Sequence, residues 1–208
     1  MPSGAGVERV WIFPTAPGRI ARVSREYPES VVLTVGDFLL RPPDVAEYRE
    51  VLELGLDSGV RLWNPRCQIT DEASAIRDCL TGADWSDGSK ATFSIIHRDS
   101  GRYGGNIALH GIDPDTAYGK IGYRVAHWAR GQGLATQAVD SVATWALTQL
   151  SVRRIILTHA VENTASCRVA HKSGFRLEQL LSANKRFGDG LVHDEHLHIR
   201  DTKGSPAA

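Results

Sequence analysis

The chain lacks the features that would mark it for a nucleic acid or a membrane. Its 208 residues carry 24 basic and 24 acidic side chains, so the formal net charge is zero. A general electrostatic attraction to nucleic acid or to an anionic lipid surface is therefore not expected. No apolar run approaches the ~20 residues that a membrane-spanning helix needs, so we expect neither partner.

Cysteine is scarce as well. The three cysteines, Cys67, Cys79 and Cys167, are odd in number, widely spaced and without a Cys-x-x-Cys pair. This pattern argues against a disulfide framework or a zinc site and favours a reducing compartment. The first residues also lack a basic stretch followed by an apolar run, so no secretory signal is expected. The sequence therefore predicts a cytoplasmic protein.

The remaining composition suits one globular domain, since 42% of the residues are apolar. We expect an N-terminal extension over residues 1–30, a folded domain over 31–201 and a disordered tail over 202–208.

Two helices are expected in the first half of this domain. Asp44 should cap the first, which Gly55 or Gly59 should end. Thr70 or Asp71 should cap the second.

The second half changes to strand-like periodicity. Three strand-like runs between residues 91 and 125 are joined by short turns, which makes them antiparallel neighbours. The run 121–125, a long apolar-striped helix and the β-branched run 153–159 then form a βαβ unit, whose two strands should lie parallel. A further helix should end at Gly174, and the last strand is expected over 191–199 after a loop at 182–190.

A glycine-containing stretch at residues 128–136 connects the first strand of the βαβ unit to its helix. Glycine lets the backbone turn sharply and approach a ligand closely. The first amides of a helix have no internal partners, and the helix dipole adds positive charge there, so an anion is favoured. Thr136 stands where a dinucleotide fingerprint needs its third glycine, and no Gly-Lys-Ser/Thr follows, which argues against the common nucleotide motifs.

The run Arg130-Gly131-Gln132-Gly133-Leu134-Ala135 resembles the Gln/Arg-x-x-Gly-x-Gly/Ala motif of the GNAT N-acetyltransferase superfamily. The run 121–125 precedes it as the splayed strand does in that family, and 163–175 resembles the family's Asn-x-x-Ser…Lys-x-Gly-Phe segment. Together these motifs are most similar to the RimJ/RimL-like (ribosomal-protein-alanine N-acetyltransferase) branch. The resemblance implies an α/β (α+β) GNAT fold: a mostly antiparallel mixed sheet splayed at its centre, with helices on both faces.

The resemblance also implies a reaction and its site. Acetyl-CoA would be the donor and a primary amine the acceptor, in direct transfer without a metal. The residues that the resemblance places against acetyl-CoA are Tyr123, Val125, Arg130, Gly131, Gln132, Gly133, Leu134, Ala135, Thr136, Asn163 and Arg168. Of these, the backbone near Val125 would also supply an oxyanion donor, and Ser166 would protonate the departing thiolate.

The general base departs from the branch pattern, because Lys120 stands where an acidic residue is common. His110 is the best substitute by residue type, since imidazole titrates near neutrality. Asp113, Glu162, Asp194 and water are weaker candidates. Simpler interpretations also stand: Arg130 as a solvated cation, Asn163 and Ser166 as helix-cap residues, and His110 as a structural histidine.

The sequence allows more than one activity and more than one acceptor. The chain could bind acyl-CoA without catalysis as a sensor or partner subunit, or transfer a larger group such as succinyl. The acceptor could be a protein N-terminus or a small-molecule amine, and a homodimer is allowed. A metal site of His193, His196 and His198 is disfavoured, because alternation on a strand puts His193 on the opposite face.

Overall fold

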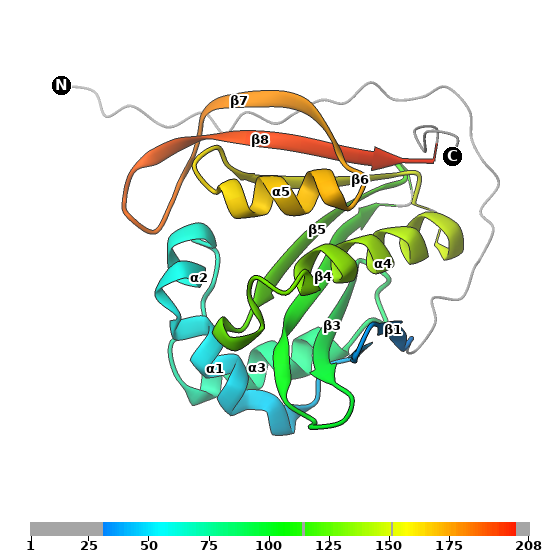
Figure 1. The fold of residues 1–208 in the computed structure, drawn as a ribbon, viewed down its shortest axis with the longest axis vertical. Helices are drawn as coiled ribbons and strands as arrows, with labels where there is room; N and C mark the ends of the chain where they lie inside the picture. The colour runs from blue at the N-terminus through cyan, green and yellow to red at the C-terminus, as the bar shows by residue number, and fades with distance from the viewer. Residues whose placement is uncertain (1–30, 114, 151, 203–208) are drawn as a thin grey trace.

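A single eight-stranded sheet, in the order β1-β2-β3-β4-β5-β6-β8-β7, runs through the computed structural model (Figure 1). The structure describes residues 31–113, 115–150 and 152–202, so the predicted extension and nearly all of the predicted tail lie outside the described residues. The strands are β1 Leu33–Val35, β2 Phe38–Arg41, β3 Lys90–His97, β4 Tyr103–Asp113, β5 Tyr118–Val125, β6 Arg154–Ala160, β7 Arg176–Arg186 and β8 Val192–Asp201. The helices are α1 Tyr48–Leu56, α2 Ser58–Trp63, α3 Glu72–Ala83, α4 Leu134–Gln149 and α5 Thr164–Lys172.

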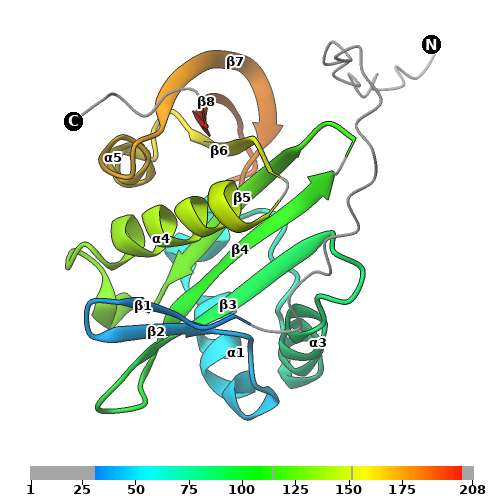
Figure 2. The ribbon, with the colours of Figure 1, turned by 90° about the vertical axis from the view of Figure 1, so that its right-hand side faces the viewer.

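The strand pairing confirms the predicted mixed sheet. Strands β3, β4 and β5 are antiparallel neighbours, and β5 and β6, joined through α4, are parallel. Helices α4 and α5 cover one face of the sheet and α1 and α3 the other (Figure 2). The fold is therefore the α+β arrangement with helices on both faces that the resemblance implied.

The sheet is splayed between β5 and β6. Their pairing is limited to Tyr118–Arg154, Gly119–Ile155 and Lys120–Ile156. Beyond Lys120, β5 pairs with β4, and beyond Ile156, β6 pairs with β8. Among the described residues no strand fills the space between them. The facing edges of 121–125 and 157–160 are thus left open at the centre of the molecule.

Two apolar clusters hold the helices to the sheet. The larger lies between α4 and the sheet, where Val139, Val142 and Ala143 are fully buried against residues such as Phe93 and Ile107. These α4 residues belong to the stripe that the sequence predicted, because positions three and four apart share one helix face. The smaller cluster lies on the opposite face and joins α1 and α3 to β3 and β4.

The predicted helix starts are confirmed, but the end of the first helix is wrong. Asp44 caps a short 3₁₀ turn, Val45–Glu47, with a complete capping box, and this turn leads into α1. Gly55 does not end α1; a side chain there would collide with Ile69, so it is a packing residue. The helix stops at Asp57, which instead caps the unpredicted α2, and Gly59 lies inside α2. Asp71 caps α3 as predicted.

The hairpin of β7 and β8 also differs from expectation. Gly174 follows α5 with a positive φ of 78°, as a C-terminal glycine should. However, β7 continues to Arg186, through most of the predicted loop 182–190. The sequence of this strand gives no strand-like alternation, because its residues are mostly polar and exposed and its pairing with β8 does not bury them.

The helices that the structure describes include none with the length and apolar character of a membrane span.

Candidate active site

The open edges of β5 and β6 form the walls of a cleft of about 2260 Å³. The glycine stretch closes one end, and α2 and the β7–β8 hairpin flank it. All but one of the site residues predicted from the sequence line this cleft; they are His110, Tyr123, Val125, Arg130, Gly131, Gly133, Leu134, Ala135, Thr136, Asn163, Ser166 and Arg168. Gln132 is not among the lining residues that the structure describes, and its side chain donates instead to the carbonyl of Trp128 at 2.8 Å.

The glycine stretch forms an open backbone cradle. Gly131 and Gly133 have φ values of 76° and 81°, a left-handed conformation that side chains disfavour. Gly133 is the N-cap of α4 and has no side chain with which to cap it. The first amides of α4, at 134–136, therefore face the cleft as donors, with the positive end of a 16-residue helix behind them. This geometry suits a phosphate group.

Arg130 holds the cradle in place. Its guanidinium contacts the Asp57 carboxylate at 2.8 Å and the carbonyl of Val125 at 3.0 Å. Partial burial opposes ionisation of Asp57, but hydrogen bonds from Arg130 and the Val60 amide outweigh it and lower the pKa of that carboxyl. The arginine thus joins the loop to the start of α2. Its role is in part structural, whereas the sequence alone favoured neither a solvated cation nor a phosphate contact.

The open edge of β5 presents backbone groups to the cleft. The Ala126 amide donates to Gly104 of β4 at 2.9 Å. Amides of successive strand residues point to opposite edges. The Val125 amide therefore points away from β4, toward the splay. A free strand amide at this position can donate to an extended ligand or to a developing oxyanion.

A hydrogen bond between two hydroxyl groups joins β5 to α5 in the cleft. The Tyr123 hydroxyl and the Ser166 hydroxyl lie 2.9 Å apart. Burial raises the pKa of Tyr123 to about 12, although its hydrogen bond with Ser166 opposes this shift. Asn163 caps α5 by accepting from the Ser166 amide at 3.1 Å, so its side chain orients Ser166. All three residues were expected at the site from the sequence, but the contact between Tyr123 and Ser166 was not.

His110 lies on the other face of the β4–β5 pair, between two lysines. Lys90 of β3 and Lys120 of β5 are its register partners. Desolvation by the cleft walls and the nearby charges of Lys120 and Arg66 lower the pKa of His110 below the ordinary 6.5, although the residue is exposed to the cleft. The ring is therefore neutral at neutral pH, the form in which it can accept a proton.

The structure also places the weaker candidate bases and reveals one that was missed. Asp113 is tied to the turn hydroxyl of Thr116, Glu162 to His193, and Asp194 to the Ala183 amide, and none is among the described lining residues. Glu195 lines the cleft instead, is only 3% exposed and accepts from the side chain of Asn184. On β8, alternation puts Glu195 on one face with Leu197 and Ile199, and an acidic residue on such a face was the available signal.

Positive side chains outnumber negative ones along the cleft. Its lining includes Arg66, Arg77, Lys90, Lys120 and Lys185, against the carboxylates of Asp78 and Glu195. The chain as a whole has no net charge. The local excess is therefore a property of this cleft, and it favours a ligand with negative charge.

The comparisons with known proteins agree with this geometry. Residues 37–176 match the acetyltransferase (GNAT) domain family. YdaF of Bacillus subtilis (strain 168), provisionally named a ribosomal N-acetyltransferase, is 32% identical over 90 residues, which are 43% of this chain and 49% of YdaF. The uncharacterized N-acetyltransferase p20 of Bacillus licheniformis is 31% identical over 97 residues, 46% of this chain and 53% of p20. The chain thus spans about half the length of these curated relatives.

Solved structures resemble this chain more closely in fold than in amino-acid sequence. RimL, a ribosomal L7/L12 alpha-N-protein acetyltransferase solved in complex with coenzyme A, superposes with a TM-score of 0.75 at 20% identity. The superposition covers 82% of this chain and 98% of RimL. At this identity the likeness establishes the fold.

Proposed function

Because the chain belongs to the GNAT acetyltransferase domain family, we propose that it is an acyltransferase that moves the acetyl group of acetyl-CoA to a primary amine. Transfer takes place directly, with both substrates in the cleft. The observation that carries this proposal is the open β5 edge running into the backbone cradle at Gly131 and Gly133. An extended ligand ending in a pyrophosphate fits that combination, since strand amides hold its arm and helix amides its phosphates.

In the proposed reaction, the base and the acid lie on opposite faces of β5. His110 accepts the proton of the attacking amine, since its lowered pKa keeps the ring neutral. The Val125 amide donates to the oxyanion that develops on the thioester carbonyl. Ser166, hydrogen-bonded to Tyr123, donates a proton to the departing thiolate. Asn163 and Arg168 line the same wall and complete the cofactor side.

The acceptor that suits the cleft carries negative charge close to its amine. The cations that line the cleft, of which Lys90 and Lys120 flank His110, would attract an acidic peptide N-terminus better than a basic one. RimL, whose fold is similar, is described as an alpha-N-protein acetyltransferase, so a peptide amine is a reasonable acceptor to test first.

The test is amine-dependent release of CoA thiol from acetyl-CoA. Matched peptides whose second and third residues are acidic, neutral or basic should be acetylated in that order, and added salt should narrow the differences. Succinyl-CoA in the same assay measures the preference for the acyl group. Tight acetyl-CoA binding without thiol release from any amine would contradict the enzyme proposal and favour a non-catalytic acyl-CoA-binding protein.

A further inference from the structure

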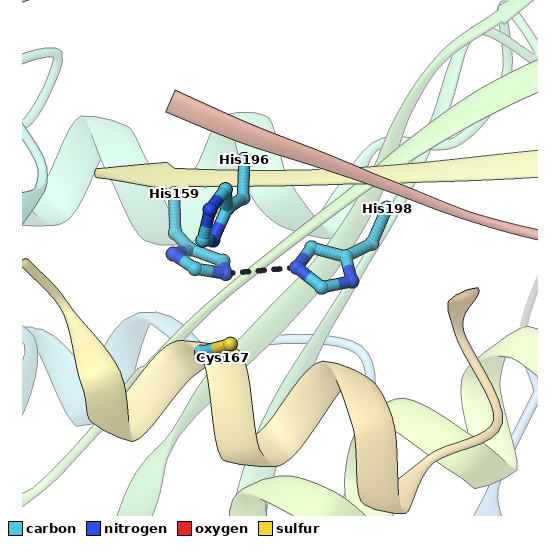
Figure 3. A group of neighbouring side chains, drawn as sticks. All are labelled: His159, Cys167, His196 and His198. Carbon is cyan, nitrogen blue, oxygen red and sulfur yellow. Dashed lines mark hydrogen bonds between the residues drawn. The ribbon is translucent and has the colours of Figure 1, made fainter. Parts of the chain in front are cut away.

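A second cluster of reactive side chains lies between α5 and the β6–β8 pair. His159 of β6 is the register partner of His196 of β8. His198 lies two residues further along β8, on the same face as His196. Cys167 of α5 points at these three rings from the opposite side (Figure 3). The potential ligand atoms of all four residues lie within 4.8 Å of one another. We propose that His159, Cys167, His196 and His198 form a structural Zn²⁺ site.

The spacing of the ligand atoms fits a tetrahedral metal. The Nε2 atoms of His159 and His198 are 3.1 Å apart. A tetrahedron with Zn–N bonds of about 2.0–2.1 Å has an edge of roughly 3.3 Å, so only small side-chain shifts are needed. Three imidazoles and one thiolate make a complete ligand set for zinc, and four protein ligands are typical of a structural site.

Hydrogen bonds among the described residues satisfy the ring nitrogens of the cluster only in part, and one of these bonds joins Nε2 of His159 to Nε2 of His198. His159 places Nδ1 2.7 Å from the carbonyl of Ala160, which requires a proton on Nδ1 and leaves Nε2 with a lone pair directed at the cluster. His198 is fully buried, and no hydrogen-bond partner among the described residues reaches its Nδ1 or that of His196.

A route from solvent leads to the cluster. A small hollow of about 440 Å³ is lined by Cys167, His196 and His171, which lies one helical turn beyond Cys167. The ring of His171 packs edge-on against that of His198, with centroids 5.2 Å apart. Arg168 and Lys172 also line the hollow, but both side chains are exposed, so solvent screens much of their charge.

Zinc at this position would fix α5 to both strands beneath it. Cys167 directly follows Ser166, and Asn163 caps the same nine-residue helix. The metal would therefore hold the α5 wall of the cleft, without itself facing the reacting atoms. This inference does not depend on the proposed acetyl transfer, because its tests measure metal and thiol directly.

The first test is a Zn²⁺ titration of the full chain, purified without a polyhistidine tag and stripped with a chelator, against a chromogenic competitor. We expect one Zn²⁺ per chain. Loss of a residue that merely supports a ligand costs about 10–100-fold in metal affinity, so Cys167→Ser should weaken binding at least about 100-fold. Cys67→Ser is the matched control, because Cys67 is also a half-buried free thiol but lies outside the cluster. Equal affinity in both variants would overturn the proposal.

A second test needs no variant and so does not depend on how the variants fold. Alkylation of Cys167 in the unmodified chain is followed by peptide mass spectrometry, with Cys67 as the internal reference. Stoichiometric Zn²⁺ should slow alkylation of Cys167 at least about tenfold and leave Cys67 unchanged, because a coordinated thiolate is no longer a free nucleophile. An unchanged Cys167 rate would show that the thiol is not a ligand.

Discussion

At the scale of single residues, the proposed reaction depends on His110 and its charged neighbours. Desolvation of its ring within the cleft and the nearby charges of Lys120 and Arg66 lower the pKa of His110 below the ordinary 6.5. The depressed pKa makes His110 a weaker base but keeps it in the proton-accepting form at neutral pH. In the proposed reaction, Lys120 therefore does not act as the base itself; it lowers the pKa of His110, the proposed base on the neighbouring strand.

His110→Ala should reduce kcat/KM by about 10²–10⁴-fold, the usual contribution of a general base. The loss should be largest above pH 6.5, where the ring of the unsubstituted protein is neutral, and should shrink at lower pH, where that ring is protonated and already inactive. A pH profile of kcat/KM for both proteins checks this. Glu195→Gln is the comparison: if it removes the acid limb and His110→Ala does not, the buried carboxylate is the base.

The hydrogen bond between Ser166 and Tyr123 leads to a second prediction. If the two hydroxyls act as one proton relay, Ser166→Ala and Tyr123→Phe should each lower kcat at least about tenfold, with little change in KM for the amine. The double variant should then be no slower than the slower single variant, because residues that act as a unit are not additive. Single-turnover rates of all three variants provide the measurement. Fully additive losses would mean that the two hydroxyls have separate roles.

At the scale of elements, the glycine cradle can be tested without disturbing the core. A methyl group at Gly131 meets no protein atom within 4 Å, and the same is true of Gly101 in the β3–β4 turn, which has a similar φ of 66°. Gly131→Ala and Gly101→Ala should therefore each lose about 1 kcal/mol of stability from the left-handed backbone. Only Gly131→Ala should weaken acetyl-CoA binding, by at least about tenfold. Calorimetric titration and thermal unfolding separate the two effects; equal affinities would contradict the cradle.

The helices and strands show which parts of the fold could be predicted from the sequence. Local signals were sufficient for the starts of α1 and α3, for the β5–α4–β6 unit and for the cradle, since caps, alternation and helical stripes act within one segment. They failed at Gly55, where the deciding contact is with Ile69, and at β7, where the deciding partner is β8. Both depend on residues distant in the chain, whose approach no local pattern records.

The same limit applies to the sites. The cofactor side follows from one contiguous motif, and most of its residues line the cleft. The Cys/His cluster draws its members from β6, α5 and β8. Alternation correctly separated His193 from His196 and His198, since His193 contacts Asp189 and Glu162 instead. It could not reveal that His159 lies beside them on the next strand, because strand order is set by the whole sheet.

At the scale of the whole molecule, the sheet consists of two parts joined by few hydrogen bonds. Among the described residues, the sheet pairing between β1–β5 and the strands β6, β8 and β7 is the short β5–β6 ladder. A contact with α2 adds to it, since the Gly188 amide in the β7–β8 hairpin donates to the carbonyl of Leu62 at 3.0 Å. A ligand that pairs with the open edge of β5 and with the cradle would lie beside this junction. Its binding energy therefore adds to the stability of the entire domain, since it binds the folded chain alone.

Coenzyme A at 100 times its Kd should thus stabilise the fold by about 2.7 kcal/mol. For a chain of 208 residues, each kcal/mol raises Tm by about 2–4 °C, so the expected shift is roughly 5–10 °C. Pantetheine at the same concentration should shift Tm much less, because it leaves the α4 amides unused. Equal shifts for both ligands in a thermal melt would mean that the phosphates do not bind at Gly131 and Gly133. A large shift that Gly131→Ala abolishes and Gly101→Ala retains would place the anion at the start of α4.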